Sequence, residues 1–409
     1  MKLSWISSFF LLGVLIVAGI FFDSGFYQED TPAVITRLPE PQIQIPATTS
    51  APKAPTLNAK YACVMDADSG RDLYTKKAGD KVPMASTTKI MTAILALEAN
   101  CLSDTVTASR KAASMPKVHL GMQAGMQYRM SDLLYSLMLE SHNDTAVAIA
   151  EHIGQSVEGF ASLMNQKAKA IGLRNTHFVT PNGLDAREHY STAEDMCRLA
   201  RYAIQNKEFL ALVQTKSHSF TDISGKHTYS LSNKDAFLSY YDGALGIKTG
   251  FTNNAGYCFV GAARRSGITL TSCVLASGWP PNKSYKWTDT KALMDYALDN
   301  FYRAEFPIQD LTQANIPVID GKKDVVSLAP LTKVPILLSR FDKLTINYDI
   351  PETLYAPIRK EMAIGTVSFY INDKLYRQEQ VFPIESIEKS NFSDTIDKVL
   401  QIWMEVFGF

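Results

Sequence analysis

The chain contains 409 residues, enough for two or three domains with a substantial hydrophobic core. Its 41 basic side chains balance 41 acidic ones, so no global field favours a nucleic-acid partner. The 5 cysteines are scattered without CxxC spacing, which argues against a zinc site or a disulfide framework and predicts small core side chains. We therefore expect no metal and no cofactor. A single disulfide formed outside the cell is an alternative, but the sequence does not indicate which two cysteines would pair.

The N-terminal segment is strongly apolar. A run from Ile6 to Phe22 follows Lys2 and gives way to acidic residues, which predicts a secretory signal or an uncleaved membrane anchor over residues 1–24. A buried helix of a soluble protein is the alternative, and the terminal position disfavours it. Residues 25–56 are rich in proline, threonine and alanine, and they predict an extended linker because they bury too little apolar surface to fold.

The first globular domain is expected over residues 57–304. It opens with two short strands around a turn at 67–70, followed by a buried helix in PMASTTKIMTAILALEAN, residues 83–100. Ser86 and Lys89 lie three residues apart at the start of this helix, on one face, which is the arrangement of a nucleophile and its base. Burial would lower the proton affinity of Lys89, although neighbouring charges could oppose this. Serine and lysine share this spacing four times in the chain, but only this pair opens a long apolar helix.

Further elements of this domain follow in order. A helical pattern pauses between Glu140 and Asp144, which predicts an interhelical turn that carries Ser141, His142 and Asn143. Another helix ends at Gly172, and the next is expected to start with Ser191 or Thr192 as its cap. The segments ALGIKTGF, AGYCFVGAARR and ITLTSCVLAS then predict consecutive strands, and KWTDTKALMDYALDNFYR predicts a closing helix. Strands at both ends around central helices predict an α/β (α+β) domain with an antiparallel sheet and a helical cluster.

The C-terminal part has a different pattern. Residues 305–388 predict a small all-β domain, because VPILLSRF, KLTINYDI, GTVSFYIN and EQVFPIES are short segments separated by polar turns. Residues 389–409 predict an amphipathic helix with apolar residues at helical spacing. This helix either lies on a membrane surface or packs on the β domain, and the sequence does not choose between the two.

Three motifs occur in a fixed order: Ser86-Thr87-Thr88-Lys89, Ser141-His142-Asn143 and Lys248-Thr249-Gly250. Together they resemble the motif set of penicillin-recognising serine enzymes. The stretches SHNDTAVAIAEHIG, TPNGLDAREHYSTAEDM and KTGFTNNAGYCFVGAARR further resemble low-molecular-weight D-alanyl-D-alanine carboxypeptidases, which form serine peptidase family S11 and are penicillin-binding proteins. The likeness covers residues 57–302 and implies a transpeptidase/β-lactamase-like fold. The small β domain and the amphipathic tail also fit the layout of that family.

The resemblance implies roles for the residues of the first two motifs. Ser86 would be the nucleophile that forms an acyl-enzyme with the penultimate D-alanine of a stem peptide and releases the terminal D-alanine. Lys89 would accept the proton of Ser86, since a hydroxyl needs an adjacent base. Ser141 would pass a proton toward the leaving amine, and Asn143 would contact Lys89 and a substrate carbonyl. His142 is interpreted as structural.

The third motif would form one wall of the substrate cleft. Lys248 and Thr249 would line it, and Gly250 would let the substrate lie along the strand. The backbone N–H groups of Ser86 and Phe251 would form the oxyanion hole. Lys286 corresponds to an arginine that binds the terminal carboxylate in family members, and it would supply a point charge instead of a bidentate fork.

The expected partners are peptidoglycan stem peptides, β-lactam antibiotics as covalent inhibitors, and a membrane surface. The resemblance places the protein on the outer face of the bacterial cytoplasmic membrane, in cell-wall biogenesis and the control of cell shape. A serine β-lactamase is one alternative, but it needs a carboxylate that activates the deacylating water, often in Glu-x-x-Leu-Asn, and that sequence is absent. A non-catalytic penicillin-binding wall protein is the other, and the intact motifs argue against it.

Overall fold

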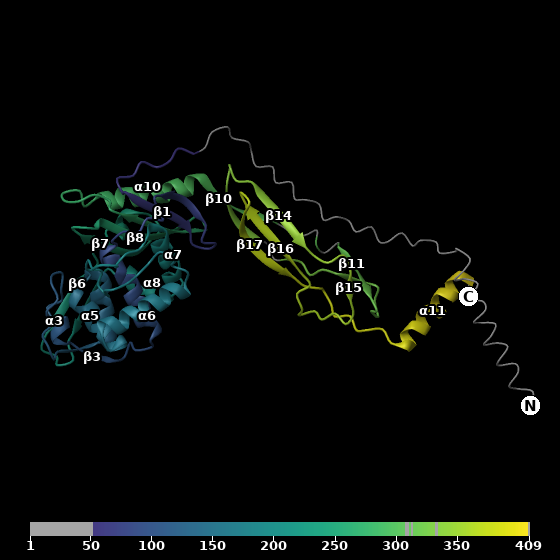
Figure 1. Ribbon diagram of the computed structural model, residues 1–409, viewed down its shortest axis with the longest axis horizontal. Coiled ribbons are helices and arrows are strands. Elements are labelled where there is room, and N and C mark those ends of the chain that lie inside the picture. The colour runs from purple at the N-terminus through teal and green to yellow at the C-terminus, as the bar shows by residue number, and fades with distance from the viewer. Residues whose placement is uncertain (1–51, 307–310, 312–313, 332–333, 408–409) are drawn as a thin grey trace, which may run out of the picture. The chain divides into compact units, whose positions relative to one another are not determined.

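The computed structural model describes residues 52–306, 311, 314–331 and 334–407 (Figure 1). These residues form two compact units. The first contains residues 52–304 together with 336–342, and the second contains the remaining described residues. Every candidate site residue lies in the first unit. The apolar run of residues 6–22 and nearly all of the proline-rich linker lie outside the described residues.

A five-stranded antiparallel sheet forms the centre of the first unit. Its strands, in sheet order, are β2 (Asp72–Lys76), β1 (Tyr61–Asp66), β9 (Ile268–Leu275), β8 (Gly256–Arg265) and β7 (Ala244–Thr252). The first two strands of the domain thus pair with the last three, which confirms that the sheet is assembled from both ends of the domain. The order also leaves β7, the strand of the third motif, at an edge.

The sheet is covered on both faces, since alternate residues of each strand join different cores. On β9, Cys273 and Leu275 pack into the large core of the helical cluster, whereas Leu270 and Val274 pack with helix α10 (Tyr285–Asn300). All eight residues of β9 are buried as a result. Figure 1 shows α10 along one side of the sheet and, on the opposite side, α5 (Asn143–Gly154), α6 (Val157–Ala170), α7 (Ala193–Ala203) and α8 (Lys207–Gln214).

The helical cluster is built around α2 (Lys89–Glu98), in which eight of ten residues are buried. Apolar residues on nearly every side of this helix account for its central position. Helix α7 (Ala193–Ala203) begins as expected, because Thr192 accepts a hydrogen bond from the N–H of Asp195. The sequence reading missed α8 (Lys207–Gln214), which Asn206 caps. The other elements of the cluster are α3 (Arg110–Ala113), α4 (Met130–Tyr135), η2 (Ser136–Glu140), α5, α6 and the hairpins β3 (Thr105–Thr107) with β4 (Gln127–Arg129) and β5 (Ser217–Thr221) with β6 (Thr228–Ser232). The short helix α9 (Phe237–Tyr240) lies on the other face of the sheet, where Phe237 packs in the core beside α10.

The second unit is β-rich, as predicted. It contains two three-stranded sheets and a terminal helix, α11 (Phe392–Phe407). The sheets are β12 (Val325–Ser327), β11 (Asn315–Ile319) and β15 (Leu354–Tyr355), and β14 (Leu344–Asp349), β16 (Gly365–Ile371) and β17 (Lys374–Val381). One expectation differs: the VPILLSRF strand, β13 (Val334–Ser339), pairs with β10 (Phe301–Phe306), and residues 336–342 pack with the first unit. Burial of Leu337 in the core beside α10 explains this.

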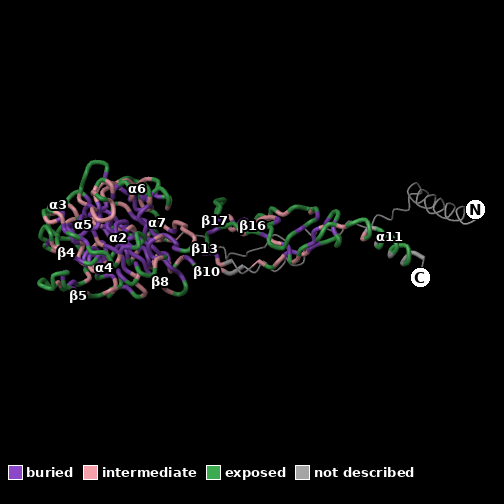
Figure 2. Tube along the Cα trace, turned by 90° about the horizontal axis from the view of Figure 1, so that it is seen from below, coloured by how far each residue is buried: buried purple, intermediate pink, exposed green. Residues whose placement is uncertain are grey.

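Helix α11 exposes those of its apolar side chains that the structure describes (Figure 2). Phe392 is 82% exposed and Val399 is 59% exposed, so the described side chains of this helix do not form a buried core. Within the part of the chain that the structure describes, no helix has both the length and the apolar character needed to cross a bilayer.

Candidate active site

Ser86 lies in a short 3₁₀ turn, η1 (Ala85–Thr88), that leads directly into α2. Neither Thr87 nor Thr88 caps the start of α2 with its side chain. Thr87 donates to the carbonyl of Met84 at 2.6 Å and Thr88 to that of Ala85 at 2.9 Å, so both side chains tie the turn to its own start. Ala85 adopts a left-handed conformation (φ 49°) just before the serine. Such backbone strain is typical of functional sites.

Lys89 is fully buried and reaches three oxygen atoms. Its Nζ lies 2.9 Å from Ser86 Oγ, 2.9 Å from Asn143 Oδ1 and 2.7 Å from the backbone carbonyl of Asn182. Burial holds the pKa of Lys89 well below its usual range, and the nearby positive charge of Lys248 lowers it further. The negative charge of Asp144 acts in the opposite direction. The predicted pairing of Ser86 with a buried lysine is therefore present in the structure.

The second motif lies on the turn between α4–η2 and α5. Ser141 ends the η2 turn in a left-handed conformation (φ 69°), and Asn143 is the first residue of α5. The Oγ of Ser141 is buried and has no hydrogen-bond partner within the described structure. His142 instead bonds to Ser136, with Nδ1 2.8 Å from Oγ, and lies beside Glu140. These contacts are those of a structural histidine.

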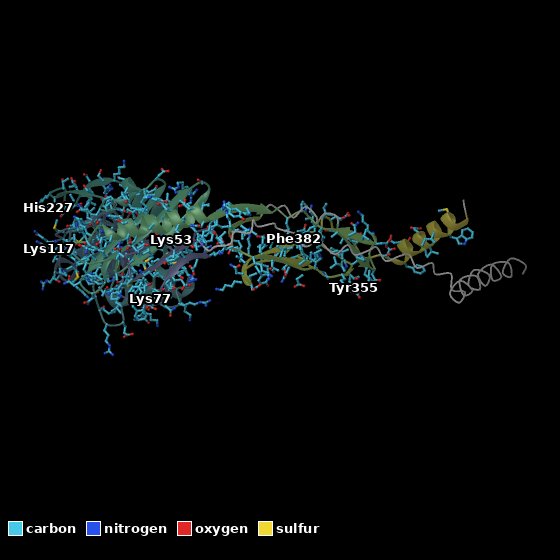
Figure 3. The ribbon with its side chains drawn as sticks, turned by 90° about the horizontal axis from the view of Figure 1, so that it is seen from above. Lys53, Lys77, Lys117, His227, Tyr355 and Phe382 are labelled. Carbon is cyan, nitrogen blue, oxygen red and sulfur yellow. The ribbon has the colours of Figure 1, made fainter. Side chains whose placement is uncertain are left out.

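Asn143 is held from both sides. Its side chain accepts from Lys89 and donates to the carbonyl of Pro116 at 3.2 Å, and its backbone N–H donates to the carbonyl of Val118 at 2.8 Å. Residues 116–118 therefore border the site. Lys117, in the middle of this segment, is exposed at the surface of the first unit (Figure 3).

The third motif lies on β7 beside η1. Lys248 is buried, and its Nζ donates to the carbonyl of Thr249 at 3.2 Å. Burial lowers the pKa of Lys248 to about 8, against the opposing effect of the Asp235 carboxylate. A Cβ atom on Gly250 would lie 3.0 Å from the backbone nitrogen of Ser86. The absence of a side chain at Gly250 thus lets β7 approach the nucleophile. This role is additional to the one expected from the sequence, in which Gly250 makes room for the substrate along the strand.

The hydrogen bonds of Tyr257 settle the direction of the Phe251 N–H group. Tyr257 donates its N–H to the carbonyl of Gly278 (2.9 Å) and accepts at its own carbonyl from Ser277 (2.8 Å), both on the side away from β7. Phe251 is the register partner of Tyr257. Paired residues in an antiparallel ladder exchange both bonds or neither. The N–H of Phe251 therefore points to the open edge of the sheet.

Lys286 lies in the first turn of α10 and is largely buried. Its Nζ donates to the carbonyl of Lys283 at 2.5 Å and lies 4.8 Å and 4.6 Å from the ring centres of Tyr257 and Trp287. Burial lowers the pKa of Lys286 to about 8. The described contacts of Lys286 include none with Ser86 or Lys89. Its link to the other motifs runs through Asp235, whose charge acts on both Lys286 and Lys248.

Three residues of this site were not singled out from the sequence. The carbonyl of Asn182 accepts from Lys89, and Gly183 lies so close to η1 that a Cβ atom would be 2.0 Å from the carbonyl oxygen of Ala85. Asp144 binds the backbone N–H groups of residues 120–122 through both carboxylate oxygens. The Pro-Asn-Gly turn at 181–183 was a visible signal, because glycine in a tight turn often marks a close approach of two backbones.

A hydroxyl beside a buried amine, an amide that holds this amine, and a lysine-bearing edge strand can together support acyl transfer to serine. No group of three histidine, cysteine or acidic side chains suited to a metal ion occurs among the residues described. This fold and this site define the class of penicillin-recognising serine peptidases.

The comparisons with known proteins specify the class further. A family model described as D-alanyl-D-alanine carboxypeptidase matches residues 48–278, and one described as the C-terminal domain of penicillin-binding protein 5 matches residues 305–389. The chain therefore belongs to the D-alanyl-D-alanine carboxypeptidase family of serine peptidases. This confirms the family, the enzyme class and the fold inferred from the three motifs.

Similar proteins match over most of their length. The D-alanyl-D-alanine carboxypeptidase DacC of Escherichia coli (strain K12) is 31% identical over 374 residues, which cover 87% of this chain and 91% of the relative. DacF of Bacillus subtilis (strain 168) is 28% identical, covering 84% and 90%. The crystal structure of penicillin binding protein 5 from Haemophilus influenzae superimposes with a TM-score of 0.69 at 25% identity, covering 83% of this chain and all of that structure.

Proposed function

We propose that this carboxypeptidase removes the terminal D-alanine from peptidoglycan stem peptides through an acyl ester on Ser86. The observation that carries the proposal is the 2.9 Å contact between Ser86 Oγ and the buried Nζ of Lys89. Desolvation favours the neutral amine, and a neutral amine can accept the hydroxyl proton near neutral pH.

In the acylation step, Ser86 Oγ forms a bond to the carbonyl carbon of the penultimate D-alanine while Lys89 takes the hydroxyl proton. The N–H groups of Ser86 and Phe251 stabilise the negative oxygen, each donor contributing typically about 3 kcal/mol. The peptide C–N bond then breaks. The proton passes through Ser141 to the amine of the departing D-alanine, and the free Oγ of Ser141 is suited to this relay.

In the deacylation step, water attacks the ester carbonyl and the ester C–O bond breaks. One proton of the water is transferred to Ser86 Oγ, the other is released to solvent, and the shortened peptide leaves with a new carboxylate. Lys248 and Thr249 line the edge of β7, where the peptide substrate would add as an extended strand. Lys248 and Lys286 supply positive charge for the terminal carboxylate of the substrate.

Penicillins would acylate the same serine and inhibit the enzyme. The β-lactamase alternative requires a carboxylate that activates water at the ester. No carboxylate of the described residues is hydrogen-bonded to Ser86 or Lys89. Glu194 follows the turn at 181–183 in the sequence, and its carboxylate is paired with Arg198 at 2.6 Å.

The experiment uses the full chain in detergent and a synthetic peptide that ends in D-Ala-D-Ala. We expect release of free D-alanine, slow turnover of a labelled penicillin adduct, and loss of both activities in Ser86→Ala. Release of D-alanine that persists in this variant would refute the assignment of the nucleophile. Penicillin turnover faster than peptide turnover would favour the β-lactamase instead.

Location outside the cytoplasm, on the outer face of the membrane, is part of the same proposal. The apolar run before residue 24 supports export, and the exposed apolar side chains of α11 support contact with the lipid surface. We also retain the domain boundaries at 24, 56, 304 and 388 as proposals.

A further inference from the structure

Asp235 is a buried carboxyl group that the proposed reaction does not use. It lies in the loop between β6 and α9 and is 7% exposed. One oxygen, Oδ1, accepts the N–H of Phe237 at 2.9 Å. The other, Oδ2, is buried without a hydrogen-bond partner in the described structure. A buried polar atom of this kind is costly and calls for a physical reason.

The loop around Asp235 is rigidly held. The N–H of Asp235 donates to Asn233 Oδ1, and the Asn233 side chain donates to the carbonyls of Val213 and Thr215, each at 2.9 Å. The N–H of Lys234 donates to the carbonyl of Leu139, close to the turn that carries Ser141. These bonds tie the loop to the second motif, so the carboxyl group has little freedom to move away from the site.

The loop also packs against α10, which carries Lys286, and against β8, the neighbour of the strand that carries Lys248. The ring of Phe237 lies 5.5 Å from that of Phe259 on β8 and 6.4 Å from that of Trp287 on α10. The charges that act on Asp235 are Lys248 on β7 and Lys286 on α10. Of the neighbouring charges, Lys234 is paired with Glu140 at 3.3 Å, and Lys283 acts on Lys286. Asp235 is thus a buried acidic group whose charge interacts with those of both Lys248 and Lys286.

We propose that Asp235 is a positioning residue that keeps Lys248 and Lys286 charged, and thereby sets recognition of the terminal carboxylate of the substrate. The inference rests on the proposed function. Both cations lose solvation on burial, and a carboxylate nearby restores part of the lost stabilisation of their charged forms. Oδ2 has no hydrogen-bond partner among the described residues, so the carboxylate acts on the lysines through its charge and not through a direct ion pair.

The direction of the pH effect follows from the charges. Burial raises the pKa of Asp235 to about 7, while the two lysines have a pKa of about 8. Between these values all three groups are charged. Removal of the carboxylate takes away the factor that raises the pKa of both lysines, so they lose their protons at lower pH. Recognition of a carboxylate then fails earlier on the alkaline side.

The test compares Asp235→Asn with the matched control Asp242→Asn, which removes an exposed acidic group that follows α9. Asparagine still accepts the N–H of Phe237. We expect KM for the D-Ala-D-Ala peptide to rise in Asp235→Asn by up to about tenfold above pH 8, where a fall of one unit in the pKa of the lysines removes most of their charge. We expect kcat to change little, and the alkaline limb of kcat/KM to shift to lower pH. The control should match the unsubstituted enzyme.

A second measurement isolates the carboxylate. Competitive inhibition of penicillin acylation is measured with the peptide acid and with its C-terminal amide. Asp235→Asn should weaken the acid and leave the amide unchanged, which a merely structural role would not do. Equal loss for both ligands, or unchanged KM and pH profile, would overturn the inference. If Asp235→Asn does not fold, Asp235→Ser retains an acceptor and serves in its place.

These outcomes separate the inference from the function on which it rests. An unsubstituted enzyme that releases no D-alanine would refute the proposed function. An active enzyme that is indifferent to Asp235→Asn would refute only the role of Asp235.

Discussion

The chemistry proposed for the three motifs depends on the positions of a few side-chain atoms. Lys89 Nζ contacts Ser86, Asn143 and Asn182 at once, which leaves the amine little choice of position. Lys248 is close enough to lower the pKa of Lys89, and Asp235 in turn raises the pKa of Lys248. Burial is the largest cause of the low proton affinity of Lys89, and the positive charge of Lys248 adds to it.

Gly250 gives a test of this placement. In Gly250→Ala, the new Cβ atom would lie 3.0 Å from the nitrogen of Ser86 and 3.1 Å from Ala85 Cβ. The 3₁₀ turn must therefore move away from β7, which separates the two N–H donors of the oxyanion hole. We expect the rate of penicillin acylation to fall by about 10²-fold, the effect of one lost donor.

The control for this variant is Gly79→Ala. A Cβ atom at Gly79 would have no neighbour within 4 Å. Acylation and thermal unfolding of this control should match those of the unsubstituted enzyme. An acylation rate in Gly250→Ala equal to that of the control would mean that the approach of β7 to Ser86 is not needed for catalysis.

At the scale of elements, helix α7 supports both the sheet and the central helix. Its start is fixed by Thr192, whose buried side chain accepts from the N–H of Asp195 at 3.0 Å. Thr192→Ala should lower the free energy of unfolding by about 1 kcal/mol, the usual value of a cap. D-alanine release should be retained. Chemical denaturation of the full chain measures the change.

Two further variants separate the cap from other effects of the substitution. Thr192→Ser keeps the accepting oxygen and should recover most of the lost stability. Thr288→Ala removes an exposed threonine inside α10 and should cost nothing, because alanine is the better helix former. A loss in Thr192→Ser equal to that in Thr192→Ala would assign the effect to the methyl group or to packing.

Some helices and strands could be predicted from local sequence patterns, and others could not. Helix α2, the antiparallel sheet and the Thr192 cap were predictable because hydrophobic period and capping are local signals. Helix α8 was not predicted, although Asn206 caps its start. Residues 336–339 of β13 pack with the first unit although they lie in the segment expected to form the second domain, because the pairing of β13 with β10 depends on contacts across the chain.

The same division applies to the site. Ser86, Lys89, Ser141, Asn143 and Lys248 lie in short motifs and could be named from the sequence. Their roles stay predictions, although the contacts of Lys89 agree with them. The Asn182 carbonyl and Asp235 carry no such local signature. Only the folded chain brings a backbone oxygen 93 positions away to Lys89.

At the scale of the whole molecule, the membrane attachment that we propose rests on the two ends of the chain. Helix α11 exposes Val399 and Leu400 (59% and 52%) together with other apolar residues. An amphipathic helix binds the interface in proportion to its buried apolar area. Asp394 and Asp397 lie on the same helix, so anionic lipids should add little to this binding.

We therefore expect a chain that lacks residues 1–24 to float with phosphatidylcholine vesicles, and the double variant Val399→Asp/Leu400→Asp to lose this binding. D-alanine release from a soluble peptide should be equal in both, because every proposed catalytic residue lies in the first unit. The matched control is Asp397→Asn, which should float at least as well as its parent. Flotation of the double variant at the level of its parent would assign attachment to another surface, and α11 would then need a protein partner for its apolar side chains.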